Sequence, residues 1–346
     1  MRYSLWMVCT ISLLSILTGC FQSQSKKQLV ICSWADYVDD DLVRQFEEEN
    51  DCEVVFDYFE SNESLLAKLM AGGGGYDLIT PTDYLLPILK QKQMIQKPDH
   101  AKIPNIQYID PTIAEKLGDA TCEWSVPYFI SLTGIGYRKD AFPTPPDSWR
   151  VFGDSKYKNR VTLMNNMRET MGAALITLGY SCNSVDEKEL AEARDLLLEW
   201  KKNIAKYSVD EVKQGIANGE YYAIHGYNGD ILQINQNHPE VDFVIPKEGC
   251  IFGGDHFVIP SNANDPDLAM KYINFMTDPK HCAQNMLFVR YTSANSEAIQ
   301  LLPPEMRDNP MIFFSKEVLD HAEMLQDVGD KTQTISKYWD EVQSGS

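Results

Sequence analysis

Aromatic rings and carboxylates stand close together at several points of the chain. The first such group, Trp34, Asp36 and Tyr37, directly follows the apolar run 28–32. Two aromatic faces beside a carboxylate suit an organic cation, which gains cation–π contact and charge pairing together. A turn that holds two partly buried rings is the other explanation of this segment.

A second group, Thr82, Asp83 and Tyr84, follows the predicted strand 76–80. Ligands of open α/β sheets bind at the carboxyl ends of the strands, where both groups are expected to lie. Asn166 and Glu169 follow another β-type run in the same way.

Asp255 lies between two apolar runs and directly after two glycines. A carboxylate in such surroundings needs a partner, or waits for one, because an isolated buried charge is costly. The candidate groups therefore share one chemistry, the recognition of a positively charged organic ligand.

The elements that must position these groups alternate between strand and helix. β-Branched and aromatic runs predict the strands, and Asp, Ser and Asn residues at the helix starts supply cap chemistry. This pattern predicts a doubly wound α/β lobe with a parallel sheet. The first strands and helices are expected at 28–33, 39–50, 53–59, 61–70 and 76–80.

Two later segments extend this pattern. The apolar run 126–137, broken by Thr133 and Gly134, predicts a strand that crosses between lobes. Asp186 is the expected cap of a long helix, and His225 is interpreted as a structural histidine whose hydrogen bonds are satisfied. The predicted inner stripe of that helix is Ala193, Leu196, Leu197, Trp200 and Ile204.

The first 20 residues are interpreted as a signal peptide, with Arg2 before the apolar stretch 5–17. The stretch ends in Leu17-Thr18-Gly19-Cys20, which resembles the bacterial lipobox, so Cys20 is predicted to carry lipid. Residues 21–27 are expected to form a polar tether. Ordinary secretion with cleavage nearby is the alternative.

Composition narrows the class of protein. The net charge of −19, from 31 basic and 50 acidic residues, argues against a nucleic-acid partner and is compatible with a cationic ligand. Beyond the signal and Cys20, the cysteines are widely spaced and contain no Cys-x-x-Cys, so neither a metal site nor another cofactor is expected. Disulfides and buried thiols both remain open.

Taken together, these segments resemble the periplasmic spermidine/putrescine-binding proteins of bacterial ABC importers. The resemblance runs from about Leu29 to the C-terminus. The motifs that carry it are Trp34-Ala35-Asp36-Tyr37, Glu60-Ser61-Asn62-Glu63, Tyr76-Asp77-Leu78-Ile79-Thr80-Pro81-Thr82-Asp83-Tyr84, Val126-Pro127-Tyr128, Arg168-Glu169, Leu178-Gly179-Tyr180-Ser181, Pro246-Lys247-Glu248-Gly249 and Gln326-Asp327-Val328-Gly329.

The resemblance implies a two-lobed α/β fold of the type II periplasmic-binding-protein class, with a polyamine in the cleft between the lobes. It also implies a non-enzymatic, monomeric receptor that delivers its ligand to an ABC permease. Lobe 1 is predicted to comprise 28–134 plus 256–298, and lobe 2 to comprise 135–255 plus 299–346. The ligand residues that the resemblance implies are Trp34, Asp36, Tyr37, Thr82, Tyr84, Glu169, Tyr227, Asp255, Tyr291 and Gln326.

Three positions depart from the family pattern. Asn166 stands where an acid is expected, Gly253 where an aromatic ring is expected, and Tyr227 where a Trp is expected. Asp83 is a candidate to compensate for Asn166. Because one acid and one ring are missing, we expect putrescine to bind at least as well as spermidine.

Other classes of protein remain open from the sequence. A hydrolase with paired carboxylates is one, although the chain has no Gly-x-Ser-x-Gly, His-Glu-x-x-His or P-loop motif. A receptor of the same fold for an anion or an iron chelate is another, and it would place Arg, Lys or helix N-termini in the cleft. A surface lipoprotein that acts as a sensor or adhesin would differ only in its partner.

Overall fold

The computed structural model describes residues 26–72 and 75–345. The predicted signal peptide, Cys20 and most of the predicted tether lie outside the described residues. Lys27, which the sequence placed in the tether, is instead the first residue of strand β1.

The N-terminal segment forms a parallel three-stranded sheet in the order β2-β1-β3. Strand β1 pairs with β2 through Leu29 and Val54, and with β3 through Ile31 and Leu78. The predicted parallel lobe is confirmed, although β3 is shorter than the sequence suggested. The elements are β1 (Lys27–Ser33), α1 (Asp40–Asn50), β2 (Cys52–Tyr58), α2 (Asn62–Met70), β3 (Leu78–Ile79), α3 (Leu86–Gln91), β4 (Ile95–Gln96) and α4 (Pro111–Lys116).

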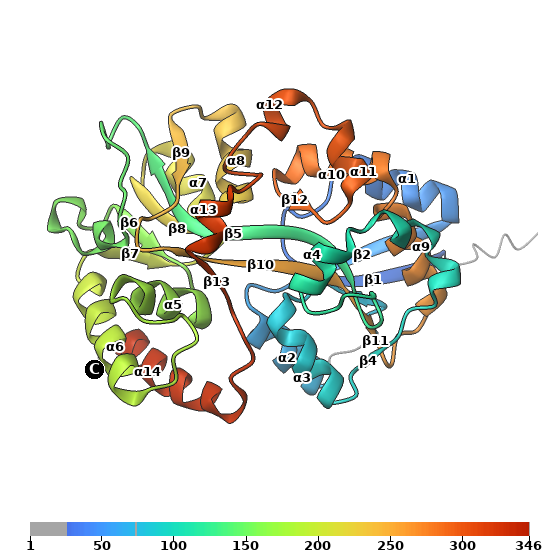
Figure 1. The fold of residues 1–346 in the computed structure, drawn as a ribbon, viewed down its shortest axis with the longest axis horizontal. Helices are drawn as coiled ribbons and strands as arrows, with labels where there is room; N and C mark the ends of the chain where they lie inside the picture. Colours follow the sequence, from blue (N-terminus) through green and yellow to red (C-terminus); the bar gives the residue numbers. More distant parts are fainter. Residues whose placement is uncertain (1–25, 73–74, 346) are drawn as a thin grey trace, which may run out of the picture.

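Two long antiparallel strands, β5 (Val126–Arg138) and β10 (Cys250–Phe257), run from one lobe into the other (Figure 1). The crossing strand predicted at 126–137 is therefore confirmed. The pairing of β5 with β10 shifts register between Gly254 and His256, so Asp255 lies at a β-bulge. A bulge re-aims side chains locally, which bears on the site described below.

The second lobe is built on the far half of β5. Strand β5 pairs antiparallel with β8 and β9, while β6 pairs parallel with both β7 and β8. Its elements are β6 (Val161–Leu163), α5 (Met167–Thr177), α6 (Glu187–Lys201), β7 (Ile204–Tyr207), α7 (Glu211–Asn218), β8 (Ala223–Tyr227), α8 (Asn228–Asn237) and β9 (Val241–Val244).

Helix α6 is capped by Asp186 as predicted, and Ala193, Leu197 and Trp200 are buried. Ile204 was wrongly assigned to this helix: the helix ends at Lys201 and Ile204 begins β7. Ile204 happens to stand at the next position of the helical spacing. An apolar β-branched residue fits the periodicity of a helix or of a strand, so the spacing could not distinguish them.

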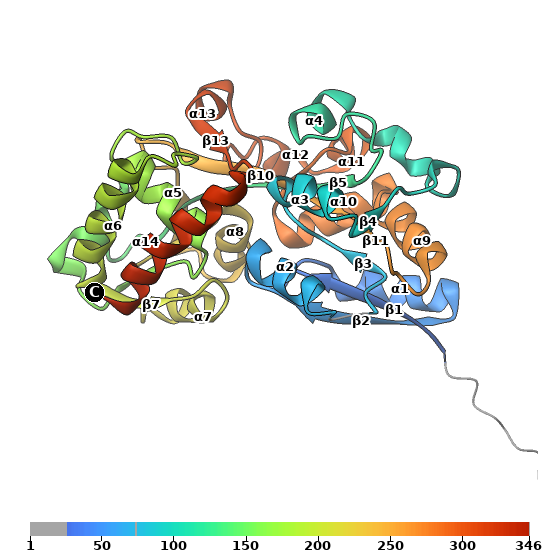
Figure 2. The same ribbon diagram turned by 90° about the horizontal axis from the view of Figure 1, so that it is seen from below.

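After β10 the chain returns to the first lobe and then crosses again near its end. Helix α14 packs beside α6 and α5 in the second lobe, as Figure 2 shows from below. The remaining elements are β11 (Ile259–Pro260), α9 (Pro266–Met276), α10 (Pro279–Val289), β12 (Thr292–Ser293), α11 (Ser296–Leu301), α12 (Pro304–Arg307), α13 (Lys316–Asp320), β13 (Ala322–Met324) and α14 (Thr332–Ser344).

Each lobe has its own hydrophobic core. One cluster is centred on Leu29, Phe46 and Phe129, and another on Trp149, Leu197 and Trp339. The first cluster also takes in Met306 and Ile312. The fold is therefore two-lobed, and the residue boundaries of the lobes given above stay a prediction.

Within residues 26–72 and 75–345, no helix is both long and apolar enough to cross a membrane. The cysteines of this part of the chain are all buried and free of disulfides: Cys32, Cys52, Cys122, Cys182, Cys250 and Cys282. His225 is buried as expected, and burial lowers its pKa to about 3. Neither of its ring nitrogens has a hydrogen-bond partner among the described residues, so the expectation of a satisfied histidine was wrong.

Candidate functional site

A cavity lies between the two lobes, under the crossing strands β5 and β10. Its walls come from the ends of β1, β3 and β8, from the middle of the crossing strands β5 and β10, from the start of α5 and from α7. The structure brings to this cavity the following residues predicted from the sequence: Trp34, Tyr37, Thr82, Asp83, Glu169, Tyr227, Asp255 and Tyr291.

Asp255 is held by two hydroxyl groups from the first lobe. Thr82 donates a hydrogen bond to Oδ1 at 2.7 Å, and Tyr37 donates one to Oδ2. The β-bulge turns this side chain toward both donors, since Thr82 and Asp255 also form an isolated β-bridge. Burial raises the pKa of Asp255 to about 6, although the two hydrogen bonds oppose the shift.

Asp83 is a second buried carboxylate of the cavity wall. Its Oδ2 accepts a hydrogen bond from the backbone N–H of Gly254 at 3.0 Å, while Oδ1 is buried and has no partner among the described residues. Burial raises the pKa of Asp83 to about 7, and the charge of Asp255 adds to the shift.

Gly253 is the reason that Asp83 has room. A Cβ at Gly253 would lie 3.3 Å from Asp83 Oδ2 and 3.3 Å from Thr82 Cγ2. The place where the family pattern puts an aromatic ring is thus next to the Asp83 carboxylate. The departure at Gly253 is thus physically linked to Asp83, the candidate that compensates for Asn166.

Glu169 is the third buried carboxylate, in the first turn of α5. Its backbone N–H donates to the Asn166 side chain at 3.2 Å, and its Oε2 is buried without a partner in the described part of the chain. Burial raises the pKa of Glu169 to about 8, while the neighbouring Arg168 works against that shift. Unpaired acceptor oxygens of this kind cost free energy unless a donor arrives.

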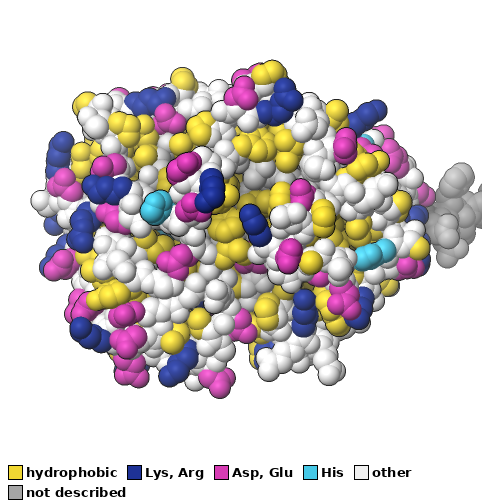
Figure 3. All heavy atoms as spheres, in the orientation of Figure 1, with side chains coloured by type: hydrophobic (Ala, Val, Ile, Leu, Met, Phe, Trp, Pro, Cys, Tyr) yellow, Lys and Arg dark blue, Asp and Glu magenta, His cyan; other side chains and the backbone are white. Residues whose placement is uncertain are grey.

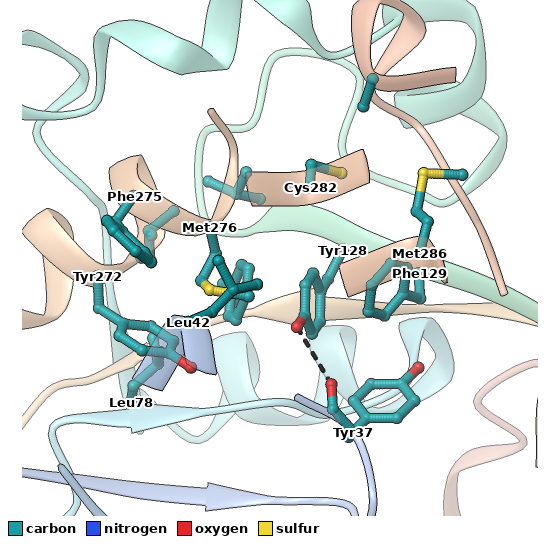
Figure 4. Packing of buried hydrophobic residues seen from close by; sticks show 14 of the residues in the cluster. Tyr37, Leu42, Leu78, Tyr128, Phe129, Tyr272, Phe275, Met276, Cys282 and Met286 are labelled. Atoms are coloured by element: carbon teal, nitrogen blue, oxygen red, sulfur yellow. Dashed lines mark hydrogen bonds between the residues drawn. The ribbon is translucent and has the colours of Figure 1, made fainter. Parts of the chain in front are cut away.

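The aromatic residues form the apolar part of the wall. Trp34 packs on Phe59 with ring centroids 4.2 Å apart, and Tyr37 packs on Tyr291 with centroids 5.7 Å apart. The backbone carbonyl of Tyr37 accepts a hydrogen bond from Tyr128 at 3.3 Å (Figure 4). This bond ties the loop after β1 to the buried Tyr128 of β5.

Four predicted residues do not line this cavity. Asn166 is the N-cap of α5, and the hydroxyl of Tyr84 lies 3.3 Å from Glu63 Oε1 beneath the Arg168 guanidinium. Gln326 is exposed, and its backbone carbonyl accepts a hydrogen bond from Arg168. Asp36 has an exposed side chain directed at Lys213, with a backbone φ of 55°.

The sequence analysis missed several residues of the wall. Phe59 and Glu60 directly follow β2, and Asp230 lies in the first turn of α8, three residues after the predicted Tyr227. The position of Asp230 beyond a strand end was a usable signal. Asp210 and Lys213 lie at the start of α7, where no pattern in the sequence indicated a site.

The walls are strongly acidic. The carboxylates that contribute to them are Glu60, Asp83, Glu169, Asp210, Asp230 and Asp255. Lys213 is the one Lys or Arg among the described residues of the wall. Such a site attracts cations and repels anions, which is the opposite of the lining that an anion receptor requires.

The outer surface has a different character. On the face seen in Figure 3, Lys and Arg side chains are interspersed with Asp and Glu. The described residues contain no group of three or more His, Cys, Asp or Glu side chains arranged to hold a metal ion. On this face the two signs of charge are mixed, whereas the cavity wall combines six carboxylates with a single lysine.

Residues 41–314 match the family of bacterial extracellular solute-binding proteins. The chain belongs to this family.

Several relatives match nearly the whole chain. A spermidine/putrescine-binding periplasmic protein of Salmonella typhimurium is 32% identical over 92% of this chain and 92% of its own length. The crystal structure of the TpPotD lipoprotein of Treponema pallidum matches with a TM-score of 0.79 and 32% identity, over 91% of this chain and 99% of that one.

A third similar protein is the spermidine/putrescine ABC transporter substrate-binding protein PotD of Streptococcus pneumoniae. Its structure matches with a TM-score of 0.75 and 30% identity, over 92% of this chain and 99% of that chain. The predicted type II periplasmic-binding-protein architecture is thus confirmed.

Proposed function

We propose that this protein is a receptor that captures a polyamine outside the cytoplasm and delivers it to an ABC permease. The proposal rests chiefly on Asp83 and Glu169, which each present to an acidic cavity a buried carboxylate oxygen that has no hydrogen-bond partner in residues 26–72 and 75–345. The names of the relatives in Salmonella and Streptococcus support the same ligand class.

The chemistry of a polyamine fits this lining. Each protonated amine needs acceptors and negative charge when it leaves water, or its desolvation is uncompensated. Glu169, Asp83 and Asp255 supply both, and Thr82 adds a hydroxyl. The methylene stem is apolar, and each buried CH₂ contributes about 0.8 kcal/mol against the rings of the wall.

Putrescine is expected to bind at least as well as spermidine. Asn166 caps a helix and supplies no negative charge to the cavity, while Asp83 supplies one beside Gly253. The buried carboxylates of the wall suffice for a diamine, whereas a third ammonium needs further acceptors of its own.

Ligand binding is expected to favour the closed arrangement of the lobes. The cavity wall contains residues of both lobes, so a ligand that contacts both stabilises closure through the strands β5 and β10. The closed shape is then the form that a permease recognises. The protein acts in this scheme as a monomer without a catalytic step.

Lipid attachment at Cys20 is part of the proposal. It rests on the Leu17-Thr18-Gly19-Cys20 motif, and the Treponema relative is itself described as a lipoprotein. Mass spectrometry of the protein from a bacterial membrane fraction tests it. The expected result is an N-terminal Cys20 that carries lipid, and loss of membrane association in the Cys20→Ser variant. A wild-type protein that is secreted without lipid, and that behaves like Cys20→Ser, would refute the proposal.

Isothermal titration of the lipid-free protein with putrescine, spermidine, an amino acid and phosphate tests the ligand class. Heat from the two polyamines alone is expected, with putrescine at least as tight as spermidine. Binding of phosphate or of the amino acid in place of the polyamines would show a different solute, and a marked preference for spermidine would contradict the expected selectivity.

A further inference from the structure

Lys213 places a positive charge in the wall of this acidic cavity. Its Nζ lies 2.9 Å from Asp210 Oδ1, 3.3 Å from Asp230 Oδ2 and 3.4 Å from Asp36 Oδ2. The side chains of Lys213 and Asp230 are 15% and 12% exposed, so this pair is largely shielded from water, whereas Asp210 is partly exposed and Asp36 is exposed. One ammonium is thus already held by three carboxylates.

The ammonium of Lys213 is charged in this setting. Burial alone would lower its pKa, but the carboxylates of Asp230 and Asp210 outweigh burial and raise the pKa above its usual value. The carboxylates are correspondingly engaged: Asp230 also accepts a hydrogen bond from the Tyr291 hydroxyl at 3.0 Å. Little acceptor capacity of Asp230 is left for a second cation.

Lys213 also separates two spaces. Lys213 and Asp230 line the cavity between the lobes, and both line an open groove on the other side of them. That groove is polar and more open to solvent than the cavity. Asp36 is the residue of the first lobe that lines it. The residues that complete it are Gln214, Ala217, Gln233, Ile234, Asn237 and His238.

The geometry points to Lys213 as a specificity-determining residue that limits the length of the bound polyamine. Its ammonium takes the place, between Asp36, Asp210 and Asp230, where the third amine of a triamine would otherwise be held. A diamine ends before this point, whereas a longer polyamine meets a fixed positive charge. This inference deepens the proposed polyamine function and rests on it.

A different role for Lys213 must be distinguished in the test. Asp36 belongs to the first lobe and α7 to the second, so the pair also bridges the lobes. A bridge that only favours closure would change the affinities of all ligands by a similar factor. A length-limiting charge changes the ratio of triamine to diamine affinity instead.

The experiment compares putrescine and spermidine by isothermal titration of the wild type, Lys213→Ala and Lys213→Arg. In Lys213→Ala the carboxylates become free for the third amine, and the spermidine-to-putrescine affinity ratio is expected to rise about ten-fold or more. Lys213→Arg keeps the charge and is expected to keep the wild-type ratio. The control is Lys206→Ala, which removes another lysine of the second lobe. Within the described part of the chain its one ion pair is with Glu211, and the variant is expected to change neither affinity.

The outcomes separate this inference from the proposed function. If both ligands bind the wild type and the ratio is unchanged in Lys213→Ala, the length-limiting role is refuted while the polyamine function stands. If neither ligand binds the wild type, the proposed function itself fails. Circular dichroism and the retained putrescine affinity report whether each variant is folded.

A second measurement needs no variant. The wild type is titrated with putrescine, cadaverine and hexamethylenediamine, whose amines are spaced progressively further apart. Affinity is expected to fall steadily with chain length, because the second ammonium approaches Lys213. Affinity that holds or rises along this series would overturn the inference even if Lys213→Ala did not fold.

Discussion

Tyr37 donates the hydrogen bond of its phenolic hydroxyl to Asp255, which follows it by 218 positions in the chain. Tyr37 belongs to the loop after β1, and Asp255 to the bulge of a strand that crosses between the lobes. The bond fixes one carboxylate of the cavity before any ligand arrives. Preorganisation of this kind lowers the cost of binding, because fewer groups must be ordered.

Asp255→Asn is expected to weaken putrescine binding about ten-fold or more. Hydrogen bonds to a charged group are worth about 1.5–3 kcal/mol, and the variant removes that charge while keeping the shape of the side chain. Isothermal titration measures the effect. Asp147→Asn is the matched control, because Asp147 is 72% exposed and lies outside the cavity, and unchanged affinity in Asp255→Asn would remove Asp255 from the site.

Putrescine affinity is expected to fall as the pH drops from about 8 to about 5. Burial raises the pKa of Glu169 to about 8, of Asp83 to about 7 and of Asp255 to about 6 in the ligand-free protein. An ammonium favours the ionised carboxylates, so binding must release protons wherever these groups are partly protonated. The affinity therefore weakens at a higher pH than for carboxyls with an unperturbed pKa near about 4.

Titration calorimetry in two buffers with different ionisation enthalpies detects this proton release directly. Near neutral pH, the observed heats are expected to differ between the buffers in proportion to the protons released. Equal heats in both buffers, together with an affinity that is constant over this pH range, would contradict the expected linkage.

Glu169→Gln is expected to weaken putrescine binding and, at alkaline pH, to stabilise the ligand-free protein. The pKa of Glu169 is higher in the folded protein than in the unfolded chain, so folding favours the protonated carboxyl. The contribution of this group to the free energy of unfolding is therefore fully present below the unfolded pKa. That contribution is lost as the pH rises through about 8, where the buried carboxylate ionises. Gln cannot ionise, so the loss is avoided.

Thermal unfolding of the wild type and of Glu169→Gln, measured at several pH values, shows whether the variant is the more stable protein at alkaline pH. The midpoint of the variant is expected to exceed that of the wild type above about pH 8, and the advantage should shrink toward about pH 5. A variant that is less stable at every pH, with unaltered affinity for putrescine, would mean that Glu169 serves packing instead of the ligand.

Gly253→Ala is expected to weaken putrescine binding by displacing the Asp83 carboxylate. The new methyl would meet Asp83 Oδ2 and Thr82 Cγ2, each at 3.3 Å, which is closer than most Cβ contacts. Gly226→Ala is the control, because its methyl would meet Ile231 Cδ1 at the same 3.3 Å without a carboxylate beside it.

A double-mutant cycle with Asp83→Asn shows whether Gly253 acts through Asp83. If it does, the effects on affinity are less than additive, since both changes disturb the same carboxylate. Strict additivity, or a loss of affinity in Gly226→Ala as large as in Gly253→Ala, would point to a general disturbance of the strands around the cavity.

Local sequence patterns were sufficient to predict much of the fold. Short apolar runs and helix caps placed the parallel strands β1 and β2, helix α1 and the crossing strand β5, because these signals depend on neighbouring residues. The same patterns failed at Ile204, where periodicity alone could not tell the end of α6 from the start of β7.

The site was predictable in part for the same reason. Trp34 and Thr82 follow the ends of β1 and β3, which belong to one sheet and share its carboxyl edge, whereas Glu169 follows β6 of the other sheet. Asp36 lies two residues from Trp34, yet its side chain points elsewhere, because the left-handed backbone at this residue turns it toward Lys213. No spacing rule along the chain could have shown that.

The sequence by itself determined the α/β class, the acidic character and the types of side chain that a cationic ligand requires, since these follow from composition and local order. Only the tertiary structure decided which carboxylates share the cavity and which of them are left without a partner. It also placed Lys213 among Asp36, Asp210 and Asp230. Burial and charge pairing depend on contacts between residues far apart in the chain, and these exist only once both lobes have folded and met.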